Sequence, residues 1–327
     1  MLNGYLYGQV RPYKDMNKRD TVLSQINSTT PPAYVPAAFF MHFDRPYHHG
    51  QAAIDKHLEF FRSTGMDFVK IQYEQSLPPL PPIRQPEDWA HAPLYPEAFF
   101  EASVRVVEGL VQAAKDEALV IMTLYSPFMW ARHLAEDVVL ADHLKENPEA
   151  VKKGLEIMTE NVLNLVRGCR RAGIDGFYTS SQGGEAFRFT GTDIFRKYIK
   201  PTDLAVWAEI QSCPFNILHI CDYEGGYDDL SPFRDYPGQV VNCSLKLGDR
   251  SLTPREVSHM FGRPFMGGLD RKGVIATGSL EEIRQAAASV LAEAPERFIL
   301  AADCTVASAT PWEHVKTAID TAHQYRK

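Results

Sequence analysis

The fold of this chain is indicated most clearly by the stretch Phe215-Asn216-Ile217-Leu218-His219-Ile220-Cys221. This apolar run ends in an imidazole and a thiol, and its length and composition predict a buried strand. Seven further apolar runs have the same character, and amphipathic helical patterns lie between them. The eight predicted strands are Val35–Phe43, Phe68–Tyr73, Val120–Tyr125, Gly176–Ser180, Phe215–Cys221, Val240–Leu245, Phe265–Leu269 and Phe298–Cys304.

Helices that alternate with these strands predict a parallel α/β architecture. Eight repeats of the strand–helix unit are typical of a (β/α)8 TIM barrel, and no stretch is long or flexible enough to link two domains. We therefore predict a single-domain barrel over residues 16–327, preceded by an N-terminal extension at residues 1–15. An open, doubly wound sheet is the alternative fold. The helical patterns cover residues 51–64, 96–117, 148–172, 192–211, 254–260, 280–294 and 312–324.

The composition narrows the class of protein. The chain has 327 residues, 45% of them hydrophobic, which is enough for one large barrel with a sizeable core. Its net charge of −7, without a basic block, argues against nucleic acid as the main partner. No apolar run is long enough for a membrane helix, and no signal-peptide pattern opens the sequence. The five widely spaced cysteines fit a reducing compartment, so we expect a cytoplasmic protein.

Three residues at predicted strand ends indicate a metal site. His219 and Cys221 lie two residues apart in one predicted strand, so both side chains point to the same face. Cys304 closes the last predicted strand, and a barrel brings the carboxyl ends of its strands together. One imidazole and two thiolates are typical ligands of Zn²⁺, and three protein ligands leave a position for substrate. A metal-bound thiol is a thiolate at neutral pH, which suggests methyl transfer to sulfur.

Candidate acid–base residues end the first two predicted strands. His42 and Asp44 share one face of the first strand, and Glu74 follows the second. Two roles are open for them: orienting substrate and handling protons, or forming a structural ion pair in the barrel mouth. The stretch Asp222–Tyr227 follows the proposed ligands and contains two glycines. It predicts a flexible loop over the metal, from which a carboxylate could orient a ligand.

Several segments of the chain resemble the uroporphyrinogen decarboxylase superfamily. They extend over nearly the whole chain, and they are marks of shared fold and descent rather than of one chemistry. The resemblance implies a TIM barrel. The segments are Asn17–Leu23, Ala172–Gly176, Phe195–Pro201, Gly267–Asp270 and Thr310–Val315.

The resemblance also separates two branches of that superfamily. The decarboxylases carry an arginine-rich segment after the first strand and an essential aspartate after the second. Here these places hold Phe43–His49, with a single arginine, and Gln72–Gln75, with no aspartate, which argues against porphyrinogen decarboxylation. The pattern His219-x-Cys221 followed by a distant Cys304 is similar instead to the zinc-dependent methylcobamide:coenzyme M methyltransferases.

This second resemblance implies a ligand set and a reaction. Zn²⁺ would be held by His219, Cys221 and Cys304, and the methyl group would come from a methylcobamide on a separate corrinoid protein. Related methionine synthases have a glutamate as a further ligand, and the corresponding place here holds Cys243. Cys243 is therefore either a fourth ligand or a packed core thiol. The expected function is methyl transfer between the corrinoid and a small thiol activated by zinc.

Two other functions fit the same residues. A metal-free decarboxylase or lyase of this fold could use His42, Asp44 and Glu74 as acid–base groups on a carboxylated substrate. A non-catalytic barrel could bind zinc in a binding or regulatory role. Zinc content separates the first of these from the metal-dependent functions.

Overall fold

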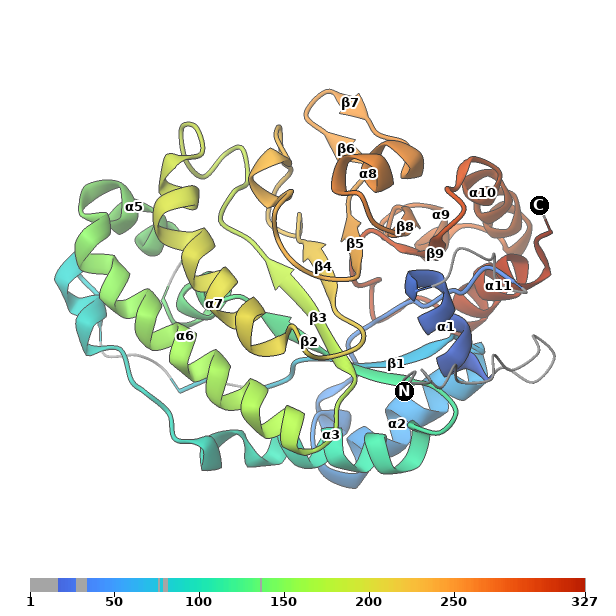
Figure 1. The fold of residues 1–327 in the computed structure, drawn as a ribbon, viewed down its shortest axis with the longest axis horizontal. Helices are drawn as coiled ribbons and strands as arrows, with labels where there is room; N and C mark the ends of the chain where they lie inside the picture. The colour runs from blue at the N-terminus through green and yellow to red at the C-terminus, as the bar shows by residue number, and fades with distance from the viewer. Residues whose placement is uncertain (1–16, 28–33, 76, 79–81, 136, 327) are drawn as a thin grey trace, which may run out of the picture.

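The computed structural model describes residues 17–27, 34–75, 77–78, 82–135 and 137–326 (Figure 1). The predicted extension at residues 1–15 lies outside this range. A short antiparallel hairpin, β6 (Lys246–Leu247) and β7 (Arg250–Ser251), stands apart from the main sheet. Seven parallel strands form that curled sheet, in the order β1 (Phe68–Ile71), β2 (Leu119–Tyr125), β3 (Gly176–Ser181), β4 (Ile217–Ile220), β5 (Val240–Cys243), β8 (Phe265–Leu269) and β9 (Phe298–Ala302).

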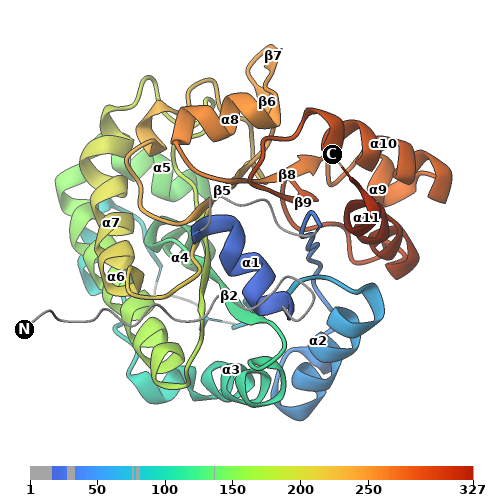
Figure 2. The ribbon, with the colours of Figure 1, turned by 45° about the vertical axis from the view of Figure 1, so that its right-hand side comes forward.

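Most helices surround the sheet on its outer side, and the helix at Lys18–Asn27 lies across the middle of the view in Figure 2. The result is a TIM-barrel-like α/β fold, which confirms the predicted class. None of the helices among the described residues is both long and apolar enough to cross a bilayer. The helices are α1 (Lys18–Asn27), α2 (Gly50–Thr64), α3 (Glu101–Ala114), α4 (Pro127–Leu134), α5 (Asp137–Glu146), α6 (Pro148–Arg171), α7 (Lys200–Ile210), α8 (Pro254–Phe261), α9 (Val274–Thr277), α10 (Leu280–Glu293) and α11 (Trp312–Gln324).

Local sequence signals explain where these helices begin. The long helix α6 starts at a proline, and the Asn147 side chain before it accepts a hydrogen bond from the Ala150 backbone N–H. Helix α10 begins with a capping box formed by Ser279 and Glu282. Helix α4, which the sequence analysis did not predict, starts at a proline with Ser126 as its N-cap.

The first predicted strand, Val35–Phe43, is the main difference from the expected barrel. The structure has no strand there, only single bridges of Ala37 to Leu300 and of Met41 to Val306. The segment still lies between the two edges of the sheet, because Ala38 N–H donates to the Leu300 carbonyl and the Ala37 carbonyl accepts from the N–H of Asp67. The physical reason is that the Asp67 carboxylate takes the Ala37 N–H at 2.7 Å, so a regular ladder cannot form.

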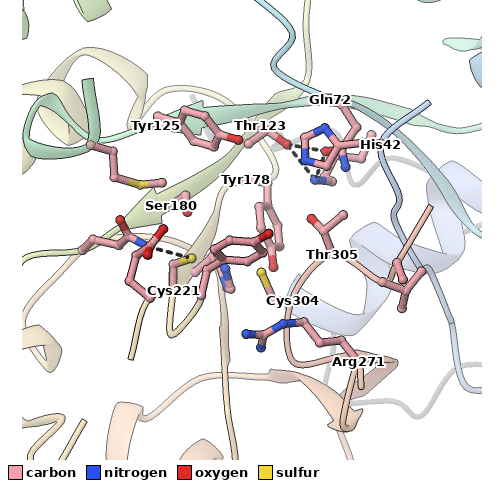
Figure 3. Close-up of a pocket in the computed structure, with 18 of the residues that line it drawn as sticks. His42, Gln72, Thr123, Tyr125, Tyr178, Ser180, Cys221, Arg271, Cys304 and Thr305 are labelled. Carbon is pink, nitrogen blue, oxygen red and sulfur yellow. Dashed lines mark hydrogen bonds between the residues drawn. The ribbon is translucent and has the colours of Figure 1, made fainter. Parts of the chain in front are cut away.

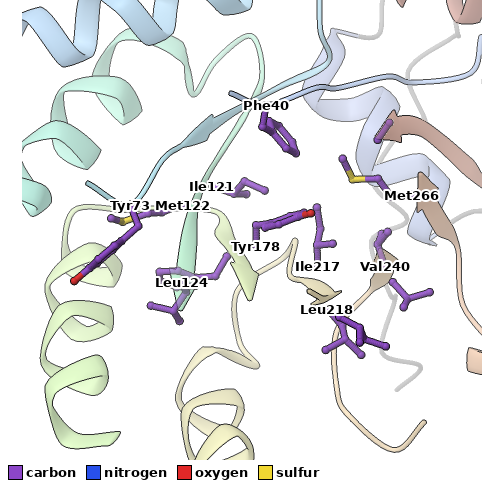
Figure 4. Close-up of a cluster of buried hydrophobic side chains, with 14 of the residues drawn as sticks. Phe40, Tyr73, Ile121, Met122, Leu124, Tyr178, Ile217, Leu218, Val240 and Met266 are labelled. Carbon is purple, nitrogen blue, oxygen red and sulfur yellow. The ribbon is translucent and has the colours of Figure 1, made fainter. Parts of the chain in front are cut away.

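The registers of the strands determine which side chains face the interior. Parallel pairing aligns Ser180 with His219 and His219 with Asn242, so these three share one face. Ile220 and Cys243 are paired with each other on the opposite face, toward the helices. Apolar side chains of the strands and Phe40 pack together in the core (Figure 4). The polar side chains of Ser180 and His219 therefore lie at the carboxyl end of the sheet, as functional groups do in other barrels of this type.

A close approach between β3 and the chain leading into β4 depends on Gly176. A Cβ at this position would lie 1.9 Å from the Phe215 carbonyl oxygen, and backbone cannot move aside as a side chain can. We expect Gly176→Ala to lower the free energy of unfolding by about 3 kcal/mol, the upper end of overpacking costs. Urea unfolding would measure it. Gly226→Ala is the matched control, because nothing lies within 4 Å of its Cβ position. An equal effect of both variants would contradict the prediction.

Candidate metal centre

His219, Cys221 and Cys304 come together at the carboxyl end of the sheet. One ligand atom from each lies within 4.8 Å of the others, and all three side chains are buried. His219 is on β4, Cys221 directly follows it, and Cys304 follows β9. The three predicted ligands thus converge from two strands that are separated by β5 and β8 in the sheet.

His219 is the most informative member of this cluster. Its side chain is buried, and neither ring nitrogen has a hydrogen-bond partner among the residues that the structure describes. One face of the ring stacks on Tyr178, with 4.6 Å between the ring centroids, which fixes its orientation. A buried imidazole normally satisfies both nitrogens, and each unsatisfied one costs about 1–3 kcal/mol. The orphaned nitrogens are what a metal-ligating histidine would show without its ion.

The two thiols interact with each other. Hydrogen bonding from Cys221 lowers the pKa of Cys304, and the same bond, with burial, raises the pKa of Cys221. The pair therefore holds on to one proton, which a bound cation would displace. The Gln182 side-chain amide also donates to the Cys221 sulfur at 3.4 Å, and the Tyr227 hydroxyl donates to the Cys221 carbonyl at 3.1 Å. These contacts fix the direction of the Cys221 side chain.

Arg271 lies beside the cluster with its charge compensated. Its guanidinium donates to Asp222 at 2.7 Å and lies 3.5 Å from Asp303, and its backbone N–H donates to Asp303 at 2.9 Å. Burial opposes the charged form, but the two carboxylates outweigh it and raise the pKa of Arg271. Asp222, expected to lie in a loop over the metal, thus pairs with Arg271. Glu224 of the same loop pairs with Arg132 of α4 at 2.8 Å.

His219, Cys221, Cys304 and Arg271 line a cavity of about 600 Å³ (Figure 3). The volume is in the range typical of sites for small molecules. Its walls combine the sulfur atoms of the cluster with aromatic and hydroxyl groups from the neighbouring strands. The lining residues include Lys70, Gln72, Thr123, Tyr178 and His42.

Lys70 is a buried ammonium that the sequence analysis missed. It lies on β1, its side chain donates to Gln72 and Thr123 at 2.6 Å each, and it sits over the rings of Phe40 and Tyr178. Burial lowers the pKa of Lys70 to about 7. A lysine inside the otherwise apolar run Phe68–Ile71 was the available sequence signal, because lysine is almost never buried without a reason.

His42 and Glu74 meet as expected, with 2.7 Å between His42 Nδ1 and Glu74 Oε1. His42 lines the cavity, and Glu74 is mostly buried beside it. Glu74 also lies 3.7 Å from the Nε2 of His48. Asp44 is exposed, and it precedes a short helical turn over Arg45–Tyr47 instead of continuing a strand. Without that strand Asp44 does not share a face with His42, so the structure does not bring it to the cavity.

Cys243 does not join the other three ligands. It is buried and pairs in register with Ile220, so it faces the helices while His219 and Cys221 face the interior. Its interior neighbour Asn242 instead accepts a hydrogen bond from the Tyr178 hydroxyl. Of the two alternatives for Cys243, this placement favours the packed core thiol over the fourth ligand. A shift of one residue along a strand moves a side chain to the opposite face.

A comparison with models of protein families identifies the family of this chain. The model of the family described as Uroporphyrinogen decarboxylase (URO-D) matches residues 63–325, most of the chain. The chain belongs to the uroporphyrinogen decarboxylase (URO-D) family. The match confirms the resemblance noted in the sequence. No curated protein matches the chain in a sequence search.

Solved structures share the fold of this URO-D family member. A methyltransferase from Methanosarcina mazei superposes with a TM-score of 0.77 at 15% identity, over 94% of this chain and 98% of that one. A B12-independent methionine synthase from a Shewanella species, in complex with selenomethionine, gives a TM-score of 0.50 at 11% identity, over 90% of this chain and 94% of that one. At such identities the likeness supports the TIM-barrel-like fold alone.

Proposed function

We propose that this chain is a zinc-dependent methyltransferase that moves a methyl group between a corrinoid and a small thiol. The observation that carries the proposal is the buried cluster of His219, Cys221 and Cys304 with an unpartnered imidazole, open to a cavity of small-molecule size. The URO-D family and the methyltransferase among its structural neighbours support it. We propose a single-domain, eight-membered barrel as its scaffold and the cytoplasm as its location.

The residues present fit a zinc ion. Imidazole and thiolate are the donors that Zn²⁺ prefers, and three such ligands are usual in catalytic sites. An ion would displace the proton that the two thiols share and would accept the free lone pair of a His219 ring nitrogen. When bound, Zn²⁺ would supply a lowered pKa for a thiol substrate, and so a thiolate nucleophile at neutral pH. His219, Cys221 and Cys304 would hold it, without Cys243.

The remaining groups have roles that follow from their places. Tyr178 and Gln182 hold the imidazole and the Cys221 sulfur in fixed directions. A thiol that becomes a thiolate must give up its proton, and His42, oriented by Glu74, is a base in the same cavity that can accept it. Asp44 has no part in this proposal.

We infer the methyl donor from the resemblance of the ligand pattern to that of known enzymes. The pattern His219-x-Cys221 with Cys304 is similar to that of enzymes using a methylcobamide on a partner protein. A cavity of about 600 Å³ suits the thiol, so the corrinoid would be presented at the mouth by that separate protein. The Arg132–Glu224 ion pair lines the same cavity and is partly exposed, so the corrinoid protein would have to contact or displace it.

One experiment tests the function. Purified protein is expected to contain about one zinc ion per chain, and methylcobalamin should lose its methyl group, followed by absorbance, only when a thiol is added. Bound zinc without thiol-dependent demethylation would favour a non-catalytic zinc protein.

A second candidate is a metal-free decarboxylase or lyase. The specific observation in its favour is the His42–Glu74 pair in one cavity with the buried Lys70, within a family whose model is that of a decarboxylase. Such an enzyme would contain no zinc and would release carbon dioxide from a carboxylated substrate. The zinc measurement therefore separates it from the first candidate.

A further inference from the structure

Lys70 has an unusual environment for a charged side chain. Its ammonium group is buried in the sheet interior, between the rings of Phe40 and Tyr178 at 4.4 and 4.5 Å from their centroids. Two of its three N–H groups donate to neutral oxygens, those of Gln72 and Thr123. Aromatic faces and neutral oxygens stabilise a cation only in part.

No described carboxylate lies within ion-pair distance of this charge, and the more distant Glu74 and the cluster thiols offset only part of the cost of burial. The other buried cation of the cavity, Arg271, has Asp222 and Asp303 beside it, and Arg132 has Glu224. Among the described residues Lys70 forms no ion pair, although a buried charge is costly without one. The cost is visible in the protonation equilibrium, since burial lowers the pKa of Lys70 to about 7. An anion bound from solution would remove this cost.

The position of Lys70 relates it to the metal cluster. The Lys70 ammonium lies 4.5 Å from the centroid of the Tyr178 ring, and His219 stacks on the same ring. Figure 3 shows Tyr178 between the group formed by Gln72 and Thr123 and the pair formed by Cys221 and Cys304. Lys70 and the cluster line one cavity, so a small molecule can reach both.

We propose that Lys70 binds the acidic group, a carboxylate or a sulfonate, of the thiol substrate whose sulfur reaches the His219–Cys221–Cys304 cluster. The inference rests on the proposed function for the sulfur end and adds the chemistry of the other end. The third N–H of Lys70 is available as a charge-assisted donor to the anion. Lys70 is a residue for substrate recognition and takes no part in bond making.

The first test is independent of zinc and of methyl transfer. The probes are propanesulfonate and butyrate, with propanol as the neutral control, and calorimetry measures their binding to the purified protein. The wild type should bind both anions at least about tenfold more tightly than propanol, and Lys70→Met should lose that difference. Lys70→Gln is a second variant in case the first does not fold. Lys272→Met removes an exposed charge at the rim of the same cavity and should leave the preference intact.

The second test uses the zinc-loaded enzyme with a panel of thiols. Coenzyme M and mercaptoacetate carry the anion, whereas mercaptoethanol does not. Lys70→Met should raise the KM for the two anionic thiols by about tenfold to a hundredfold and leave both the KM for mercaptoethanol and the zinc content unchanged. A KM increase for all three thiols would overturn the inference.

The two tests distinguish failures. If the wild type binds propanol as well as the anions, or if Lys70→Met keeps the anion preference, the role of Lys70 is wrong, whatever the enzyme does with methyl groups. If anion binding depends on Lys70 but no thiol-dependent demethylation occurs, the anion subsite stands and the proposed function falls. If Lys272→Met removes the preference as fully as Lys70→Met, the attraction is long-range and the contact with Lys70 is excluded.

Discussion

Replacing Cys221 by alanine is expected to lower the affinity of the protein for zinc by more than about a hundredfold. Loss of one of three ligands must cost more than loss of an outer contact, which already costs roughly tenfold to a hundredfold. The fold should survive, because Cys221 lies at the carboxyl end of the sheet, above the apolar core. Zinc titration against a colorimetric chelator and the near-ultraviolet circular dichroism spectrum measure the two effects.

Cys243→Ala is the matched control for this prediction. Cys243 is equally buried and only one strand away, yet it faces the helices. Its replacement should leave zinc affinity unchanged and produce only the modest loss of stability of a core truncation. If Cys243→Ala weakened zinc binding as much as Cys221→Ala, the ligand set would have to include strand β5. Full zinc retention by Cys221→Ala would contradict the assignment of the cluster.

Lys70→Met is expected to stabilise the protein at pH 6, by on the order of 4 kcal/mol relative to the wild type. The reason is that the native state carries a buried ammonium whose pKa burial lowers from 10.5 to about 7. Methionine has a similar length and suits the space between the rings of Phe40 and Tyr178. The two former acceptors keep a hydrogen bond, since Thr123 donates to Gln72 at 3.0 Å.

The sign of the pH dependence follows from linkage. Below pH 7 the lysine is protonated in both the native and the unfolded states, so the native state carries the whole cost of burial. Between pH 7 and 10.5 the native state releases the proton while the unfolded state keeps it, so wild-type stability rises with pH. The difference between Lys70→Met and the wild type should therefore be largest at pH 6 and small at pH 10.

Urea unfolding at several pH values, without added carboxylate or sulfonate, measures this difference. Lys272→Met should show a difference that does not change with pH, because that side chain is exposed at the cavity rim. A constant difference for Lys70→Met as well would show that the ammonium has a counter-charge in the native protein. Added propanesulfonate should raise the stability of the wild type at pH 6 and leave Lys70→Met unaffected.

The sequence predicted the architecture well because most of its signals are local. The run that ends in His219 and Cys221 and the capping residues of the helices act within a few positions of the chain. The missing strand at Val35–Phe43 could not be foreseen. Its N–H at Ala37 is taken by the carboxylate of Asp67, and no short-range pattern reveals a contact between those two residues.

The site could be predicted only where the spacing of residues along the chain determines the direction of their side chains. Two residues at i and i+2 in a strand share a face, so the spacing alone predicted that the His219 and Cys221 side chains point the same way. The relative face of Cys243 depends on the register of β5 against β4, which the sequence does not state. Lys70 was overlooked because its meaning comes from neighbours on β2 and β3, the strands that supply Thr123 and Tyr178.

The proposed metal ligands come from distant parts of the chain, which would affect how the chain matures. During synthesis the segment with His219 and Cys221 is made well before Cys304, and a partly made chain offers an ion only two of its three ligands. Cys304 is brought into place by β9, whose Leu300 also bonds with Pro36 and Ala38 far back in the sequence. Capture of the proposed ion would thereby be coupled to a very long-range pairing among the described residues, and such pairings are slow to form. Chains that fail to bring their two ends together would not retain metal, so metal content would report correct assembly.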